Sequence, residues 1–177
     1  MLRRMLVAVD FSDCGRHAAQ YAFELARAMG GTVTLLHVLE DQESVPLSSE
    51  AAQTLLRELS LQARRPPKCL IVSPGRRFGG PGPAADSLGG RAGPEAQVAS
   101  AILAVTDELD ADLILLGPHG QENTDVRALG RVVQRVLLDA RQPVQVVPCN
   151  THRTTSPPSL LRQPGVSIRS GKDIRES

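Results

Sequence analysis

Short apolar runs alternate with amphipathic segments along most of the chain, and this alternation limits the fold more than any other feature. The apolar runs occupy residues 5–9, 32–38, 69–73, 113–116 and 143–147. The first carries no polar alternation, which is typical of a strand buried on both faces of a sheet. Between the runs, apolar residues recur at helical spacing. Strands that alternate strictly with helices predict an α/β fold, a single-domain, doubly wound, five-stranded parallel sheet with helices on both faces.

Local signals place the ends of the four expected helices. Ser12 or Asp13 is expected to cap the first, and Gly30-Gly31 to end it. A second helix begins at Ser48 or Ser49 and is expected to run until Pro66-Pro67. A third opens at Gly93-Pro94, with proline at the favoured first position. The fourth is expected from about Thr124 or Asp125 to Arg141, so that Gly130 lies inside it.

Two segments depart from the alternation, and the domain is therefore expected to span residues 1–148 with one insertion. Residues 74–93 are rich in Gly, Pro and Arg, and are expected to form a disordered insertion. The alternative is a lid whose Arg76 and Arg77 reach a bound phosphate. Residues 149–177 are polar and are expected to form a disordered C-terminal tail.

Composition narrows the partners and the compartment. Aromatic residues make up only 2% of the chain, and the net charge is +1, so neither nucleic acid nor a membrane surface is expected as a partner. No apolar stretch approaches the length needed to span a bilayer. Cys14, Cys69 and Cys149 are odd in number and widely spaced. This favours reduced thiols in the cytoplasm over a disulfide scaffold or a zinc site.

Three glycines follow the fourth apolar run and are the main evidence for a binding site. Gly117, Gly120 and Gly130 form the pattern Gly-x2-Gly-x9-Gly at the end of a buried strand. A strand, a glycine loop and a helix N-terminus are the parts of a phosphate cradle. Asp10 ends the first strand. If the first and fourth strands are neighbours, both features face the crevice where strand order reverses.

Each of these residues also has a structural explanation. Asp10 could cap the first helix, Gly117 could form only a turn, and Gly130 could be a packing point within the fourth helix. For His119, a backbone-anchoring or solvent-facing role is favoured over catalysis, because no nucleophile or paired carboxylate accompanies it. The catalytic set is therefore empty, and binding is favoured over enzymatic activity.

The chain resembles the universal stress protein family over residues 1 to about 148. The resemblance rests on Leu6-Val-Ala-Val-Asp10, on Val33-Thr-Leu-Leu-His-Val38, and on Ala111 to Gly120 with Gly130 and Val144-Gln-Val-Val-Pro148. It implies strand order 3-2-1-4-5, a homodimer paired through the last strand at Val144–Val147, and a stress-response regulatory role. It further implies an adenine nucleotide (ATP, ADP or AMP, with Mg2+ as an optional companion). The implied cofactor-binding residues are Asp10, Val38, Gly117, His119, Gly120, Gly130, Arg131 and Val132.

The chain departs from the family pattern around the phosphates. Arg131 stands where the pattern has Ser or Thr, Pro118 lacks an N–H group, and Glu122 and Asp125 add negative charge. Three hypotheses follow. The first is a nucleotide-binding regulatory protein, the second a nucleotide-free dimeric interaction module of the same fold, and the third a slow ATPase.

Overall fold

The computed structural model describes residues 3–39, 48–73, 93–120 and 128–149. The expected insertion (apart from Gly93), the expected tail after Cys149, and the acidic residues Glu122 and Asp125 lie outside these ranges.

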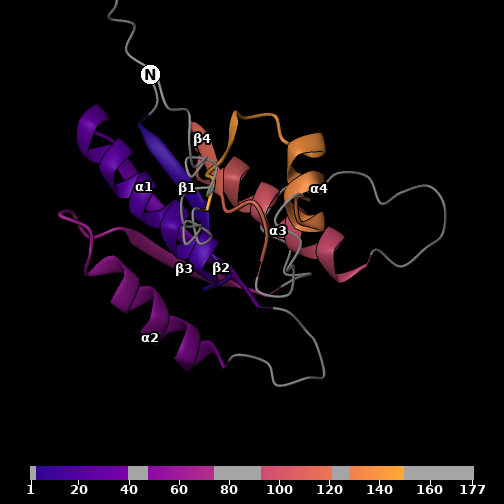
Figure 1. Ribbon diagram of the computed structural model, residues 1–177, viewed down its shortest axis with the longest axis horizontal. Helices are drawn as coiled ribbons and strands as arrows, with labels where there is room; N and C mark the ends of the chain where they lie inside the picture. Colours follow the sequence, from indigo (N-terminus) through magenta and orange to yellow (C-terminus); the bar gives the residue numbers. More distant parts are fainter. Residues whose placement is uncertain (1–2, 40–47, 74–92, 121–127, 150–177) are drawn as a thin grey trace, which may run out of the picture.

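Five parallel strands form one sheet in the order β3-β2-β1-β4-β5 (Figure 1). Their bounds are β1 Arg4–Ala8, β2 Thr32–Val38, β3 Lys68–Val72, β4 Leu113–Leu116 and β5 Val144–Val146. The expected fold class and strand order are therefore confirmed. The two central strands β1 and β4 bury nearly every side chain, as their uninterrupted apolar runs predict.

Four helices cover the two faces of the sheet, and each face has its own hydrophobic core (Figure 1). The helices are α1 Asp13–Met29, α2 Ser49–Ser60, α3 Pro94–Glu108 and α4 Arg131–Asp139. Helices α1 and α2 pack on one face through small and branched residues, with Ala18, Ala22 and Leu56 at the centre. Helices α3 and α4 pack on the other face, around Ile102 and Val136. Because all the strands are parallel, the segments that follow each strand leave the sheet at the same carboxyl edge.

The starts of the first three helices are as expected, but the fourth is shorter. Ser12 and Ser48 cap α1 and α2 by accepting hydrogen bonds from backbone N–H groups. Helix α4 begins at Arg131, not near residue 124, and Gly130 is its extended N-cap rather than an interior residue. The Gly130 N–H donates to the carbonyl of Pro118 at 2.8 Å, which fixes this point as the helix start.

Helix α2 also stops earlier than expected. It ends at Ser60, well before the two prolines, and the chain then continues in turns closed by bonds from Gln62 N–H to Leu59 and from Ala63 N–H to Ser60. The prolines therefore precede strand β3 and do not end the helix.

Candidate functional site

The candidate site lies at the carboxyl edge of the sheet, between β1 and β4. The chain leaves β1 toward β2 on one side, while β4 and β5 lie on the other, so the strand order reverses between β1 and β4. Such a reversal is where ligands bind in doubly wound sheets. Asp10 lies two residues after β1, and Gly117 follows β4 directly, so both lie at the edge of the sheet where the sequence predicts a crevice.

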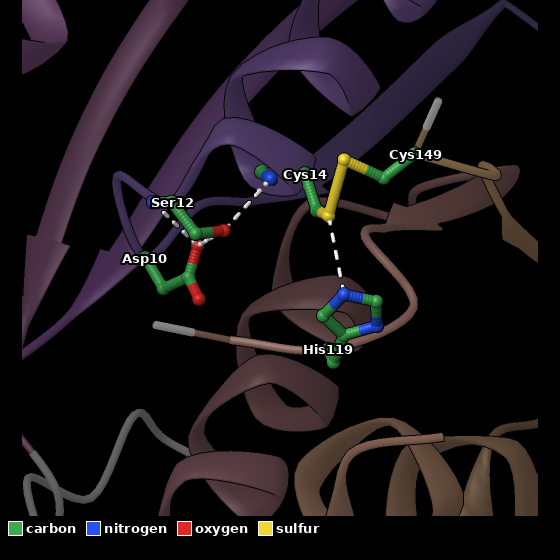
Figure 2. The surroundings of a disulfide bond; sticks show 6 residues. Asp10, Ser12, Cys14, His119 and Cys149 are labelled. Carbon is green, nitrogen blue, oxygen red and sulfur yellow. Dashed lines mark hydrogen bonds between the residues drawn. A yellow bond between two sulfur atoms is a disulfide. The ribbon is translucent and has the colours of Figure 1, made fainter. Parts of the chain in front are cut away.

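Asp10 is oriented by the serine that caps α1 (Figure 2). Its Oδ1 accepts hydrogen bonds from the backbone N–H of Ser12 at 3.1 Å and from the Ser12 hydroxyl at 2.6 Å. The same hydroxyl oxygen accepts the N–H of Gly15 at 3.0 Å. The N-cap of α1 is therefore Ser12, and the alternative in which Asp10 caps this helix is wrong. The carboxylate is a fixed anionic group at the end of β1.

The turn between β1 and α1 carries backbone strain. Phe11 has a φ of 63°, a left-handed conformation that bulky residues seldom adopt. Its ring is buried, with its centroid 4.6 Å from that of His37, and its carbonyl accepts a bond from Arg16 Nε at 3.1 Å. His37 is itself held by a bond from Nδ1 to the carbonyl of Val9 at 2.8 Å. Strain of this kind persists where surrounding contacts enforce it, often beside functional sites.

The three glycines of the motif have different surroundings. A Cβ on Gly117 would lie 2.9 Å from the backbone carbon of Cys14, and a Cβ on Gly120 would lie 2.7 Å from Oδ2 of Asp10. Packing within the protein thus accounts for both. A Cβ on Gly130 would meet nothing closer than 3.4 Å, at the Cα of His119. Of the three, Gly130 is the one where a Cβ would fit at ordinary contact distances.

Gly130 opens helix α4 without a side-chain cap. Its own N–H is bonded to Pro118. The next N–H groups, those of Arg131, Val132 and Val133, belong to the first turn, where a helix has no intrahelical acceptors to offer. These groups and the helix dipole favour an anion at this point.

The Arg131 side chain reaches helix α3. Its guanidinium forms an ion pair with Oε1 of Glu95 at 2.7 Å, and the side chain is 80% exposed. An exposed pair of this kind contributes about 0–1 kcal/mol, so little free energy opposes its opening.

Val38 stands apart from this cluster. It is the last residue of β2, its side chain is buried in the core beneath α3 and α4, and only its backbone is at the carboxyl edge. Four of the predicted site residues therefore lie close together, namely Asp10, His119, Gly120 and Gly130, while Gly117 packs against Cys14. Arg131 and Val132 follow in the adjoining helical turn, and Val38 lies one strand away.

The cysteines contradict the expected free thiols. Cys14, in the first turn of α1, and Cys149, three residues after β5, form a disulfide with a Cα–Cα distance of 4.9 Å (Figure 2). The two lie 135 residues apart in sequence, but both elements reach the carboxyl edge. Cys69 is a free, exposed thiol, and partial burial raises its pKa.

His119 contacts this disulfide, so the expected backbone-anchoring or solvent-facing role is also wrong. Its Nε2 lies 3.6 Å from Sγ of Cys14. A disulfide sulfur carries no hydrogen, so in a hydrogen bond between the two atoms Nε2 is the donor. Nδ1 is buried and has no hydrogen-bond partner among the described residues. Sequence reasoning missed the disulfide, the strained Phe11 and the coupling of Asp10 to Ser12.

Neither a metal cluster nor a membrane span is found in the part of the chain that the structure describes. No group of three His, Cys, Asp or Glu side chains there could hold a metal ion. No helix within the same ranges has the length and apolar character to cross a bilayer.

Comparisons with known proteins agree on one family. The model of the "Universal stress protein family" matches residues 1–148. A universal stress protein of Methanocaldococcus jannaschii is 25% identical over 151 residues, which cover 83% of this chain and 82% of that protein.

Solved structures share the fold. A universal stress protein in complex with cAMP has a TM-score of 0.56 at 19% identity, covering 82% of this chain and 95% of the other. The universal stress protein from Archaeoglobus fulgidus in complex with dAMP has a TM-score of 0.55 at 23% identity, covering 82% of this chain and 98% of the other.

Proposed function

Because the chain belongs to the universal stress protein family, we propose that it binds an adenine nucleotide at the carboxyl edge of its sheet and acts as a regulatory protein. The observation that carries the proposal is the N-terminus of α4, where Gly130 provides no side-chain cap and which lies beside the Asp10–Gly120 contact at the point where strand order reverses. Two relatives of the same fold are complexes with cAMP and dAMP, which supports the same ligand class here.

The described residues suit a nucleotide of this kind. The N–H groups of the first turn of α4 would face the phosphates, and Gly130, which has no side chain, would let them approach the start of the helix. Asp10 would accept hydrogen bonds from the sugar hydroxyls, and the backbone of Val38 would adjoin the base. Arg131 would turn from Glu95 to a phosphate, because a guanidinium binds phosphate more strongly than it holds an exposed carboxylate. The candidate ligands are ATP, ADP and AMP, with Mg2+ as an optional companion.

The variant Gly130→Asp tests the site with two readouts that should move in opposite directions. Aspartate is a good N-cap and adds a negative charge at a helix N-terminus, so the fold should be unchanged or stabilised by up to about 1 kcal/mol. The same carboxylate would occupy the N–H groups that the phosphate needs, so nucleotide affinity should fall at least tenfold, or by about 1.4 kcal/mol. Urea unfolding and calorimetry with ATP, ADP and AMP measure the two effects.

The control places the same charge elsewhere on the same helix. Leu138 is 80% exposed near the end of α4, so Leu138→Asp should leave nucleotide affinity unchanged. If Gly130→Asp binds as tightly as the parent chain, the phosphates do not lie at this helix. If the parent chain binds no nucleotide up to millimolar concentration, the proposal fails and the interaction-module hypothesis replaces it. Metal-dependent ATP turnover above the buffer rate would instead favour the slow ATPase.

The proposal includes a homodimer paired through β5. Strand β5 is an edge of the sheet, and edges are usually covered or paired. Val147 directs its N–H to Leu116 in β4, so Val146 directs its N–H away from the sheet. Val146→Pro removes that donor and should convert a dimer to a monomer in light scattering. A parent chain that is monomeric at high concentration would refute the dimer.

A further inference from the structure

The two sulfurs of the Cys14–Cys149 disulfide differ in accessibility. Cys14 is only 5% exposed and lies beneath the glycine loop. Cys149 is half-buried, at the end of the described chain. An external thiolate must approach a disulfide along the line of its two sulfurs, so the less buried residue is the point of attack.

The Cys14 sulfur has a ring nitrogen of His119 beside it. Nε2 of His119 lies 3.6 Å from the sulfur, and the dashed line in Figure 2 marks this contact. Cys14 also lies in the first turn of α1, where the helix dipole favours negative charge. The carboxylates of Asp10 and Asp13 belong to the same turn region and oppose a thiolate. A thiolate at Cys14 therefore depends on the bond from His119, which strengthens when its acceptor becomes charged.

The end of β5 does not depend on the disulfide for its position. Val147 is 3% exposed, and its N–H donates to the carbonyl of Leu116 at 2.8 Å. Breaking the bond between the sulfurs therefore releases Cys149 without removing β5 from the sheet. A disulfide that can open within an intact fold is suited to reversible exchange rather than only to support.

We propose that Cys14–Cys149 is a reversible thiol–disulfide exchange site that takes a dithiol as its reductant, with Cys149 as the attacked residue and Cys14 as the leaving thiolate held by His119. A thiolate of the dithiol bonds to Sγ of Cys149, the bond between the two sulfurs breaks, and Cys14 leaves with the electron pair. The second thiol of the reagent then attacks the mixed disulfide and releases Cys149 as a thiolate. The two hydrogens of the dithiol end on the two cysteines, and the dithiol becomes a cyclic disulfide.

The direction of attack is tested in the full chain carrying Cys69→Ser, which leaves only the two cysteines of interest. The native protein is treated with glutathione, quenched with iodoacetamide and mapped by mass spectrometry. We expect glutathione on Cys149 and the alkyl group on Cys14. Glutathione on Cys14, or glutathione divided equally between the two cysteines, would overturn the proposal. No reaction before denaturation would also overturn it, because the disulfide would then be purely structural.

The role of His119 is tested by the rate of reduction with dithiothreitol. His119→Ala should slow the native protein about tenfold, because a less stabilised thiolate leaves more slowly. His119→Gln, which keeps an N–H donor, should recover most of the rate, and His17→Ala, an exposed histidine on α1, should match the parent. In guanidinium chloride all four rates should be equal. An unchanged native rate in a folded His119→Ala variant would remove His119 from the proposal; if that variant does not fold, the mapping decides. None of these readouts uses a nucleotide, so they stand or fall apart from the proposed function.

Discussion

Gly117→Ala and Gly130→Ala should separate the glycine that the fold requires from the one that it does not. Gly117 has a backbone conformation outside the left-handed region, so only space limits a side chain there. Its Cβ would lie 2.9 Å from the backbone carbon of Cys14 and 3.1 Å from that residue's Cβ and carbonyl oxygen. These atoms belong to a buried helical turn that a disulfide also holds, so they cannot move aside cheaply.

The cost follows from this overlap. Overpacking by a methyl group costs about 1–3 kcal/mol, and alanine returns about 0.4–1 kcal/mol by restricting the unfolded chain. Gly117→Ala should therefore lose about 1–2 kcal/mol, or roughly 2–8 °C in Tm for a domain of this size. At Gly130 the nearest atom is at an ordinary contact distance, and the entropic gain offsets the weaker capping by alanine. Gly130→Ala should stay within about 0.5 kcal/mol of the parent.

Urea unfolding under non-reducing conditions measures both variants, and an unchanged dependence on urea would show that only stability has altered. Equal stabilities, or a larger loss in Gly130→Ala than in Gly117→Ala, would refute this account of the two glycines. Nucleotide affinity, measured beside stability, should fall in Gly130→Ala if phosphates approach that residue.

Three further predictions concern groups that hold the carboxyl and amino edges of the sheet. Ser12→Ala should cost about 1 kcal/mol in urea unfolding by removing the cap of α1, and it should weaken nucleotide binding because it also releases Asp10. The pKa of Asp112 is held below its usual value of 3.8, first by backbone N–H bonds from residues 3 and 4. Its stabilisation is therefore present above that value and lost as the pH falls through the folded pKa, so Asp112→Asn should be less stable than the parent at neutral pH and equal to it in strong acid. Cys149→Ser should cost about 2–4 kcal/mol, below the limit of about 5 kcal/mol for a loop of this length, and dithiothreitol should lower the Tm of the parent but not of the variant.

Local patterns were enough to predict most of the fold. The uninterrupted apolar runs identify β1 and β4 as central strands, and the serine caps mark the starts of α1 and α2. The start of α4 was misplaced because the helical spacing of apolar residues continues upstream of Gly130. The helix starts only at Arg131, where the Gly130 N–H bonds to the carbonyl of Pro118, a residue at the other end of the same connection between β4 and α4.

In the candidate site too, features set by local sequence could be predicted, and features set by contacts between distant residues could not. Asp10 and Gly117 could be recognised because each lies within two residues of the end of a strand, and Gly120 and Gly130 because they complete the glycine spacing that begins at Gly117. The disulfide could not, because topology alone brings Cys14 to Cys149 and no spacing rule relates residues so far apart. The role of His119 could not be predicted either, since it depends on the sulfur that this pairing places beside it.

The central place of β1 has a consequence for how the protein is made. Met5 pairs with Val33 on one side and with Leu113 on the other, so its second neighbour leaves the ribosome more than one hundred residues after it. At about 5–20 residues per second, this delay lasts roughly 5–20 s. Through that interval one edge of β1 has no native partner. The delay between the synthesis of Cys14 and that of its disulfide partner is longer, because the two are 135 residues apart. Cys69 leaves the ribosome before Cys149, so it is the first other thiol that Cys14 can meet. The native disulfide can form only after Cys149 has also been synthesised.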